Sequence, residues 1–421
     1  MKHLAALILL GNIAMAMADT PLLPSEATVA QILRNAPSVR AAAAHLNAEE
    51  AQRQRLDSGP HEWSLRVGGQ QRKTLPANAA DQHFNEWNAA LERPIRLPGK
   101  AALDRALGSS GVAIASTGLG DARHEASRAL LKAWFDWLRE RASSTQWQAQ
   151  VGLLKQQDQA VERRLQLGDA ARLERKQAAA ALAQAEAQLS QAHARLRIAE
   201  ETLQRRFPGL PRQASETLPA PQAITGKAED WIAAILAHSH ERQVSEGEAQ
   251  RASLLAQRLR QDQLPDPSVG LQFSRERAGE EKVLGAYISI PLPGGARRAQ
   301  AASGLAQAEA SAAQADAVRQ RITSEAASLY QSALAAYPTW QASELAAEQQ
   351  GQTAEMTARA YRLGEGNLND VLAARRLANE ARLNALQAHL DALESRYRLL
   401  LDSHQLWDFD EMNDPSPTTE H

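Results

Sequence analysis

The chain has 421 residues, a formal net charge of −2 at pH 7 and an aromatic content of only 4%. The near-zero charge gives no bulk electrostatic attraction to nucleic acid or to an anionic lipid surface, so we expect no nucleic-acid partner. An abundance of alanine, glutamine, leucine, arginine and glutamate is typical of long helices and argues against an ordinary globular enzyme. The absence of cysteine excludes disulfides and a lipid-modified N-terminal cysteine.

The N-terminus has the pattern of a secretory signal peptide. Lys2 precedes a short apolar stretch, and Ala16-Met17-Ala18 matches the small-x-small cleavage pattern, so residues 1–18 are predicted to be removed. The alternative is a buried first helix, but the segment that follows is polar and contains proline, which argues against it. Beyond the signal no apolar run approaches the ~18 residues of a membrane-spanning helix, so membrane insertion would have to use strands.

The mature sequence repeats its own outline. Each half contains a helical segment, two strand-like segments, a Pro-Gly pair, a long helix, a Leu-Gly break and a second long helix. Pro98-Gly99 and Pro293-Gly294 lie 195 residues apart, and Leu167-Gly168 and Leu363-Gly364 lie 196 apart. This period is too long for a solenoid of short repeats and indicates two copies of one large unit. The predicted division is a signal peptide (1–18), a first structural repeat (19–206, with a β-hairpin at about 61–95 and a helical tip near 168–171), a proline-rich linker (207–227), a second structural repeat (228–407, with a β-hairpin at about 267–292 and a tip near 364–367) and a disordered tail (408–421).

Each hairpin region holds two segments in which apolar residues alternate with polar or small ones. Such a pattern is typical of membrane strands around an aqueous lumen, although two soluble hairpins packed on helices are an alternative. Four strands cannot close a membrane barrel, because a lipid-exposed edge leaves backbone groups unpaired. The membrane interpretation therefore requires several copies of the chain. The alternating apolar positions are Trp63, Leu65 and Val67; Trp87, Ala89 and Leu91; Val269, Leu271 and Phe273; and Leu284, Ala286, Ile288 and Ile290.

The long helical segments carry alanine where a globular core would carry leucine. Residues 176–196 and 299–318 are examples, and small side chains let helices approach closely while polar ones face water. A helix from Ala296 to Leu363 would span roughly 100 Å. Pro338 lies inside this run and is expected to kink or break it.

Four motifs make the mature chain resemble the TolC-type outer-membrane efflux proteins. Two are the Leu-Gly segments L-G-D-A-A-R-L-E-R-K-Q-A at 167–178 and L-G-E-G-N-L-N-D-V-L-A-A-R at 363–375; the others follow the hairpins, L-E-R-P-I-R-L-P-G-K at 91–100 and I-S-I-P-L-P-G-G-A-R-R at 288–298. The resemblance implies an α+β membrane protein with duplicated helix–β-hairpin–helix–helix halves. It implies a homotrimer that forms a twelve-stranded β-barrel, four strands per chain, in the lipid of a Gram-negative outer membrane, on a long periplasmic α-helical barrel.

The same resemblance implies the function. The channel would passively conduct substrates from an inner-membrane pump, of RND type, through a periplasmic adaptor. Short length, an early second hairpin and no acylated cysteine are similar to the heavy-metal cation branch, whereas Gly294-Gly295-Ala296 departs from the family's usual aromatic or acidic residue there. A multidrug or type I secretion channel is an alternative. A soluble periplasmic coiled-coil protein and, further behind, an exported enzyme are the rival classes.

Motifs for catalysis, cofactors and metals are missing. Gly364-Glu365-Gly366-Asn367 lacks the spacing and the lysine of a phosphate-binding loop. His124-Glu125 is not followed by the second histidine of H-E-x-x-H, and no serine lies in a G-x-S-x-G context. His238 and His240, two apart, would point to different faces of one helix and make a poor metal pair. We expect no enzyme activity, no cofactor and no metal site.

The Leu-Gly segments are predicted to be helical hairpin turns. Gly364 or Gly366 can end the first helix in a left-handed conformation, and Asn367 can cap the next one with Asp370 three residues later. In the first half Ala171 cannot cap, although Asp169 is a candidate one turn earlier. A hairpin turn needs nothing more than this local chemistry. The resemblance adds that both turns form the periplasmic end of the tunnel, where they would contact the adaptor and where carboxylates such as Glu365 and Asp370 would gate the opening. The candidate residues are Gly168, Asp169, Glu174, Gly364, Glu365, Gly366, Asn367 and Asp370.

Overall fold

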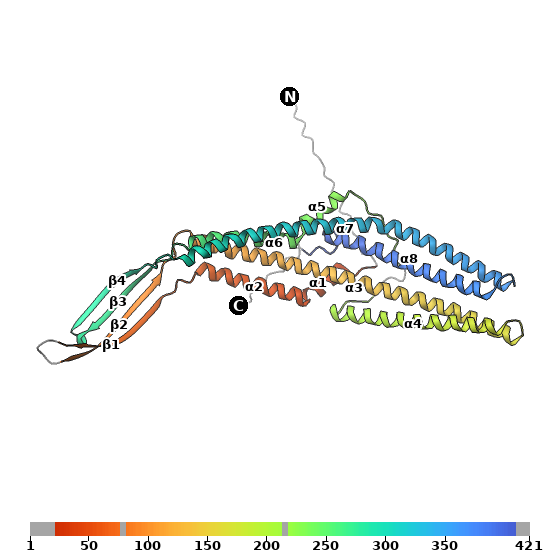
Figure 1. Ribbon diagram of the computed structural model, residues 1–421, viewed down its shortest axis with the longest axis horizontal. Helices are drawn as coiled ribbons and strands as arrows, with labels where there is room; N and C mark the ends of the chain where they lie inside the picture. Colours follow the sequence, from red (N-terminus) through yellow and green to blue (C-terminus); the bar gives the residue numbers. More distant parts are fainter. Residues whose placement is uncertain (1–21, 76–80, 213–217, 410–421) are drawn as a thin grey trace, which may run out of the picture. The chain divides into compact units, whose positions relative to one another are not determined.

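The computed structural model describes residues 22–75, 81–212 and 218–409. The predicted signal peptide and the chain after residue 409 lie outside these described residues. In chain order the elements are α1 (Glu26–Arg34), α2 (Pro37–Ser58), β1 (Ser64–Thr74), β2 (Gln82–Pro94), α3 (Lys100–Gln166), α4 (Arg172–Arg206), α5 (Ala228–His238), α6 (His240–Gln261), β3 (Ser268–Glu276), the short 3₁₀ turn η1 (Arg277–Gly279), β4 (Glu281–Ser289), α7 (Gly295–Arg362) and α8 (Leu368–Asp402) (Figure 1).

The two halves of the chain have the same order of elements and nearly the same lengths. Helices α2 and α6 have 22 residues each, and α4 and α8 have 35 each. Helix α3 has 67 residues and α7 has 68. Because each long helix keeps its length in both halves, the Leu-Gly breaks fall at matching points, as the sequence spacing predicts.

Pro338 does not break α7. The helix runs from Gly295 to Arg362 with Pro338 inside it, so of the predicted kink or break, the break does not occur. Proline removes one backbone hydrogen bond and crowds the preceding turn. Packing nearby offsets this loss: the Tyr337 and Trp340 rings lie 5.6 Å apart, and the Thr339 hydroxyl donates to the Ala335 carbonyl at 2.8 Å. A single proline in a helix this long costs too little to end it.

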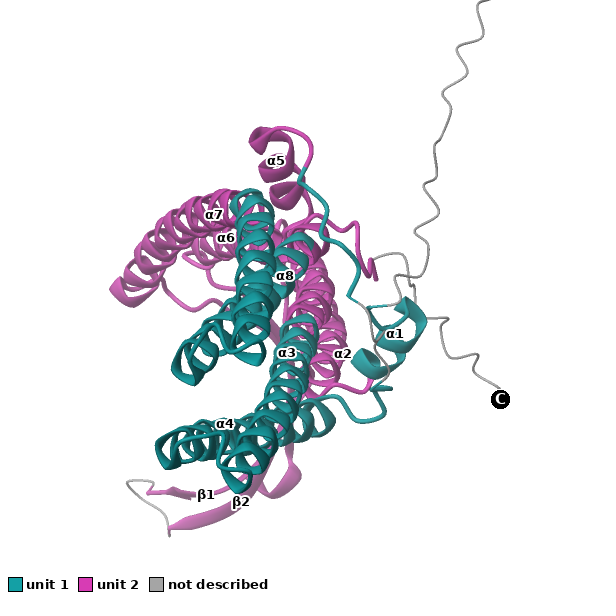
Figure 2. Cartoon of the chain, turned by 90° about the vertical axis from the view of Figure 1, so that its right-hand side faces the viewer, with its two compact units in different colours: residues 1–34, 129–224, 334–396 teal, residues 35–128, 225–333, 397–421 magenta. Residues whose placement is uncertain are grey.

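The chain forms two compact units, each built from parts of both sequence halves (Figure 2). Unit 1 consists of residues 1–34, 129–224 and 334–396, and unit 2 of residues 35–128, 225–333 and 397–421, so far as these are described. No helix in the described part of the chain is both long enough and apolar enough to cross a membrane.

The four strands of unit 2 form one antiparallel sheet in the order β1-β2-β3-β4. Its register places the predicted apolar positions opposite one another: Leu65 pairs with Leu91, and Leu91 also pairs with Leu271. Directly opposed residues point to the same side of a sheet, so the apolar positions share one face. That face is open to the surroundings, since Leu65 is 70% exposed and Leu284 is 78% exposed.

The opposite face of the sheet is polar and internally bonded. Arg72 lies 3.1 Å from the Glu86 carboxylate and 2.7 Å from that of Glu276. The Tyr287 hydroxyl donates to Glu92 at 3.0 Å. The sheet is thus apolar on one side and charged on the other, as the alternation predicts.

Alanine forms the buried stripes of the long helices in unit 1. In α4, Ala178, Ala185 and Ala192 are buried at intervals of seven residues, and in α7, Ala347 and Ala354 continue the same interval to Tyr361. A seven-residue interval is that of left-handed coiled coils. We call these two stripes the alanine seams. Larger core residues of unit 1 gather in α3, where Trp134 and Phe135 are fully buried and the Trp134 indole donates to the Leu22 carbonyl at 2.9 Å.

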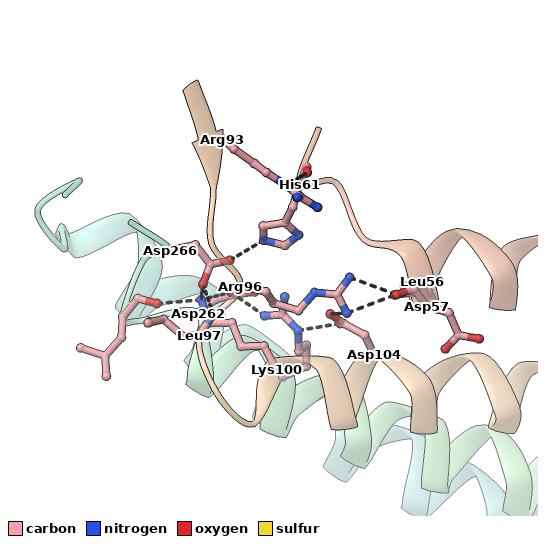
Figure 3. A network of polar contacts seen from close by, with 12 residues as sticks. Leu56, Asp57, His61, Arg93, Arg96, Leu97, Lys100, Asp104, Asp262 and Asp266 are labelled. Atoms are coloured by element: carbon pink, nitrogen blue, oxygen red, sulfur yellow. Dashed lines mark hydrogen bonds and ion pairs between the residues drawn. The ribbon is translucent and has the colours of Figure 1, made fainter. Parts of the chain in front are cut away.

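A network of ion pairs ties the sheet to the helices within unit 2 (Figure 3). The Lys100 ammonium, 1% exposed, lies 3.0 Å from Asp262 and 2.9 Å from Asp266, and it donates to the Leu264 carbonyl at 2.7 Å. Asp266 also accepts the Leu97 backbone N–H at 3.0 Å and lies 3.2 Å from the His61 ring. Burial alone would raise the pKa of Asp266, but the hydrogen bonds from Lys100 and Leu97 outweigh it and lower that pKa. We call this set of residues the junction network.

Candidate functional site at the helical tips

Both long hairpins reverse direction through the same backbone turn. Gly168 and Gly364 have φ angles of 79° and 80°, in the left-handed region that favours glycine. At each tip the glycine N–H bonds to the carbonyl three residues earlier, and the following N–H bonds to the carbonyl five residues earlier, at 2.8 to 3.1 Å. This is the Schellman motif that ends many helices. Of the two candidate glycines in the second tip, Gly364 and not Gly366 is the left-handed one.

Substitution of Gly364 by alanine is expected to destabilise unit 1, because a Cβ atom at a positive φ costs about 1 kcal/mol. Gly366→Ala is the matched control: φ is ordinary there, and the added Cβ would lie 3.5 Å from the nearest atom, the Tyr361 nitrogen. Thermal unfolding followed by circular dichroism should separate the two variants. Equal losses at both positions would contradict the assignment of the left-handed role to Gly364.

The second tip starts its new helix with a side-chain cap. The Asn367 side-chain oxygen accepts the Asp370 backbone N–H at 3.0 Å, and its amide donates to the Asp370 carboxylate at 2.7 Å. The predicted cap is therefore present. In the first tip α4 begins after Ala171 without a side-chain cap. Asp169, the candidate cap there, instead accepts a hydrogen bond from Arg164 at 2.9 Å, because this arginine on the incoming helix lies within reach.

The two tips share one hydrophobic cluster, which we call the tip core. It draws on all four long helices of unit 1, so residues some 200 positions apart in sequence pack together. The turn regions of the two long hairpins are therefore held together by this one cluster. The buried members are Val161, Ala178, Ala358, Tyr361, Leu368 and Val371.

Tyr361 joins the two hairpins at the edge of the tip core. Its hydroxyl donates to the Glu174 carboxylate at 3.1 Å, and the Arg164 guanidinium lies over its ring at 5.1 Å. Burial and the hydrogen bond to Glu174 raise the pKa of Tyr361, so the phenol stays a donor at neutral pH. Of the predicted site residues, Glu174 is the one that links α4 to α7. The sequence analysis did not predict a role for Tyr361 or Arg164, although each lies within three residues of a Leu-Gly pair.

In the first hairpin Arg175 is paired with carboxylates of the neighbouring helix. Arg175 lies 2.6 Å from the Asp158 carboxylate and contacts that of Glu162. The hydrogen bond from Arg175 lowers the pKa of Glu162, so this pair stays ionised. Sequence reasoning missed this group, because helices α3 and α4 bring it together across the turn.

The outermost surface of both tips is apolar and acidic. Leu167 and Leu363, which precede the two glycines, are 84% and 67% exposed. Glu365 and Asp370 are exposed as well, although the Asp370 carboxylate is engaged in the Asn367 cap. Each tip therefore presents one exposed leucine directly before its left-handed glycine.

The histidines that sequence analysis placed on one helix lie on two. Helix α5 ends at His238 and α6 begins at His240, with Ser239 as the cap between them, so the expectation of opposite faces is wrong. The His238 and His240 rings lie 4.7 and 5.3 Å from the His404 ring. Within the described residues no group of three or more histidine or carboxylate side chains is arranged to hold a metal ion.

The sequence matches a known protein family in its second half. Residues 231–401 match the family described as outer membrane efflux protein. No curated protein sequence matches the chain.

Solved structures with the same fold cover nearly the whole chain. CusC, described with the conformational changes that accompany folding and transmembrane channel formation, has a TM-score of 0.75 at 14% identity, over 90% of this chain and 91% of CusC. The outer membrane protein VceC of Vibrio cholerae has a TM-score of 0.70 at 17% identity, over 91% and 95%. The CmeC outer membrane channel of Campylobacter jejuni has a TM-score of 0.73 at 16% identity, over 92% and 86%. At these identities the likeness establishes a shared fold.

Proposed function

We propose that this chain is a member of the outer membrane efflux protein family, on the match of residues 231–401 and the shared fold, and that three copies of it assemble into the outer-membrane channel of a tripartite exporter. The channel has no chemistry of its own, and the energy for export comes from a partner pump in the inner membrane. A periplasmic adaptor connects that pump, of RND type, to the tips of the channel. Each copy consists of two structural repeats, residues 19–206 and 228–407.

The open four-stranded sheet carries this proposal. Its β1 and β4 edges have no strand partner within the described chain. In a lipid bilayer such edges must be closed, because unpaired backbone groups cost several kcal/mol each. Three copies would supply twelve strands, enough to close a barrel. The apolar face around Leu65 and Leu284 then contacts lipid, and the charged face around Arg72 lines the lumen.

The helical tips support the contact with an adaptor. Leu167 and Leu363 give each tip an exposed apolar residue beside a rigid turn. The tip core holds both turns in one body, so a partner meets a fixed surface rather than two independent loops. For the gate we propose Glu365, whose carboxylate is exposed, while Asp370 caps α8 through Asn367.

Assembly and conductance test the channel. Full-length protein purified from the outer-membrane fraction should run as a trimer on a gel before heating and as a monomer after heating. It should also conduct ions in planar bilayers. Recovery as a soluble periplasmic monomer would contradict the proposal and favour a soluble coiled-coil interaction protein.

Crosslinking tests the tip contact. A photo-crosslinking residue at Asn367 should capture a co-expressed candidate adaptor, while one at Ser64, at the start of β1, should not. Capture at Ser64 alone would contradict docking at the tips. For the substrate we propose heavy-metal cations, and export assays with metal ions against dyes and secreted proteins separate this from the alternatives.

A further inference from the structure

A groove on the second hairpin of unit 1 is lined by arginines that lack acidic partners. It lies among α3, α7 and α8, where Arg359, Arg362 and Arg375 line it. Within the described chain none of these three forms an ion pair. Arg375 donates only to the Leu153 carbonyl, at 3.1 Å. We call this the arginine groove.

The surroundings of Arg375 make it unfavourable for this cation to lack a counter-charge. Burial and the neighbouring positive charge of Arg362 lower the pKa of Arg375, although an arginine remains protonated at any physiological pH. A partly buried cation beside a second cation normally acquires a counter-charge. Arg382, further along the same groove, shows the ordinary arrangement, with its guanidinium 2.5 Å from the Glu344 carboxylate. The other three arginines form no ion pair within the described chain, although Glu355, one helical turn before Arg359, also lines the groove.

The matching hairpin of the first half lacks two of these three arginines. At the 196-residue spacing, Arg362 corresponds to Gln166 and Arg375 to Ala179. Two arginines near the first tip are paired: Arg164 bonds to Asp169, and Arg175 lies between Asp158 and Glu162. The cations at 362 and 375 are therefore a property of the second hairpin and do not follow from the shared fold.

The floor and rim of the groove suit a helix. Gly351 and Ala354 lie on its floor, so a partner backbone can approach α7 closely. At the rim Met356 is 72% exposed and Leu153 is 46% exposed, which offers apolar contact beside the charges. Arg359 and Arg362 are three residues apart and lie on the same side of α7. Carboxylates one helical turn apart on a partner would face them.

We propose that the arginine groove binds an acidic amphipathic helix of the periplasmic partner, whose carboxylates neutralise Arg359, Arg362 and Arg375. This inference rests on the proposed adaptor contact, and it adds which charges form that contact and where on the helices it lies. Because the first hairpin has no counterparts of Arg362 and Arg375, the partner distinguishes the two hairpins of each chain by charge. The apolar tips are common to both hairpins, whereas these two cations are present on one.

A pair of synthetic helical peptides tests the proposal on the full-length protein purified in detergent. One alanine-rich peptide of 21 residues carries glutamate at every fourth position of one face, and its control carries glutamine there. Fluorescence anisotropy should show the glutamate peptide binding at least about tenfold more tightly than the glutamine peptide at low salt. That preference should fall as sodium chloride is raised from 50 to 300 mM.

Substitutions in the groove should remove the preference. Arg362→Gln and Arg375→Gln are each expected to lose about tenfold in affinity for the glutamate peptide, and Arg375→Lys to keep part of it. Arg163→Gln is the matched control, since Arg163 is the counterpart of Arg359 on the first hairpin. Arg362 is exposed, so its variant reports on binding even if Arg375→Gln alters packing.

Three outcomes would overturn the proposal. These are equal binding of the two peptides, an undiminished preference in both groove variants, and displacement of the glutamate peptide by inorganic phosphate at a concentration equal to that of the peptide. The last would indicate a site for small anions. Conductance of the same Arg362→Gln protein in planar bilayers is expected to be unchanged, so a failure of this inference is distinguishable from a failure of the channel proposal.

Discussion

Lys100→Met is expected to lower the free energy of unfolding by about 3–5 kcal/mol, because it leaves two carboxylates close together without their shared cation. In the native protein the Lys100 ammonium lies within 3.0 Å of both Asp262 and Asp266 and is 1% exposed. Methionine keeps most of the side-chain volume, so the loss reports on charge rather than on a cavity. Denaturant unfolding of the full-length protein, followed by tryptophan fluorescence, measures it.

Lys132→Met is the control for this variant. Lys132 also forms a lysine–aspartate pair, 2.8 Å from Asp136, but its side chain is 68% exposed. Exposed pairs contribute about 0–1 kcal/mol, so this variant should remain near wild type. Similar losses in the free energy of unfolding for Lys100→Met and Lys132→Met would contradict the prediction that the buried junction network stabilises the protein more than an exposed ion pair does.

Asp402→Asn should produce the second large loss, about 3 kcal/mol at pH 7, by removing the buried carboxylate that Arg128 and Arg398 share, although Arg128 keeps its ion pair with Glu125. The Asp402 carboxylate lies 2.7 Å from Arg128 and 2.8 Å from Arg398, and it also contacts His124 at 3.4 Å. Its side chain is only 5% exposed. Asparagine has the same shape but supplies one oxygen acceptor and no charge.

The cost of Asp402→Asn should depend on pH with a definite sign. Burial would raise the pKa of Asp402, but the hydrogen bond to His124 and the charges of Arg128 and Arg398 outweigh it and hold that pKa well below its usual range. A carboxylate whose pKa is depressed in the folded state contributes stability above its unfolded pKa, and the contribution is lost as pH falls through the folded pKa. The stability difference between wild type and variant should therefore be constant above about pH 5 and narrow below about pH 4.

Asp136→Asn serves as the control in the same pH series, since Asp136 is 46% exposed. Its effect should stay within about 0.5 kcal/mol at every pH. A difference between wild type and Asp402→Asn that widens on acidification would contradict the assignment of an ionised Asp402 in the folded protein.

The sheet and the turns were predictable from sequence because their signals are local. Alternation of Leu65 and Val67 with polar residues fixes which face each side chain takes, and the observed register follows it. Asn367 before a helical run predicts a cap from a few residues alone. Ser239, between His238 and His240, is also a typical capping residue, so the start of a new helix at His240 could have been predicted in the same way.

The ion-pair networks were not predictable, because they join residues far apart in the chain. Lys100 meets Asp262 and Asp266 more than 160 residues away. Nothing in either segment specifies the other, and charged residues near a hairpin usually face water. The predicted cap at Asp169 was wrong for a related reason. A carboxylate near the start of a helix has several possible hydrogen-bond donors, and here it accepts from Arg164 of the preceding helix.

The alanine seams set how closely the long helices approach one another. Ala178, Ala185 and Ala192 each project a single methyl group, and transferring one such group out of contact costs about 0.8 kcal/mol. A leucine at the same place would interlock with the facing helix and resist displacement along the axis. Helices with methyl-lined contacts can therefore lie closer together than helices whose contacts are lined by leucine.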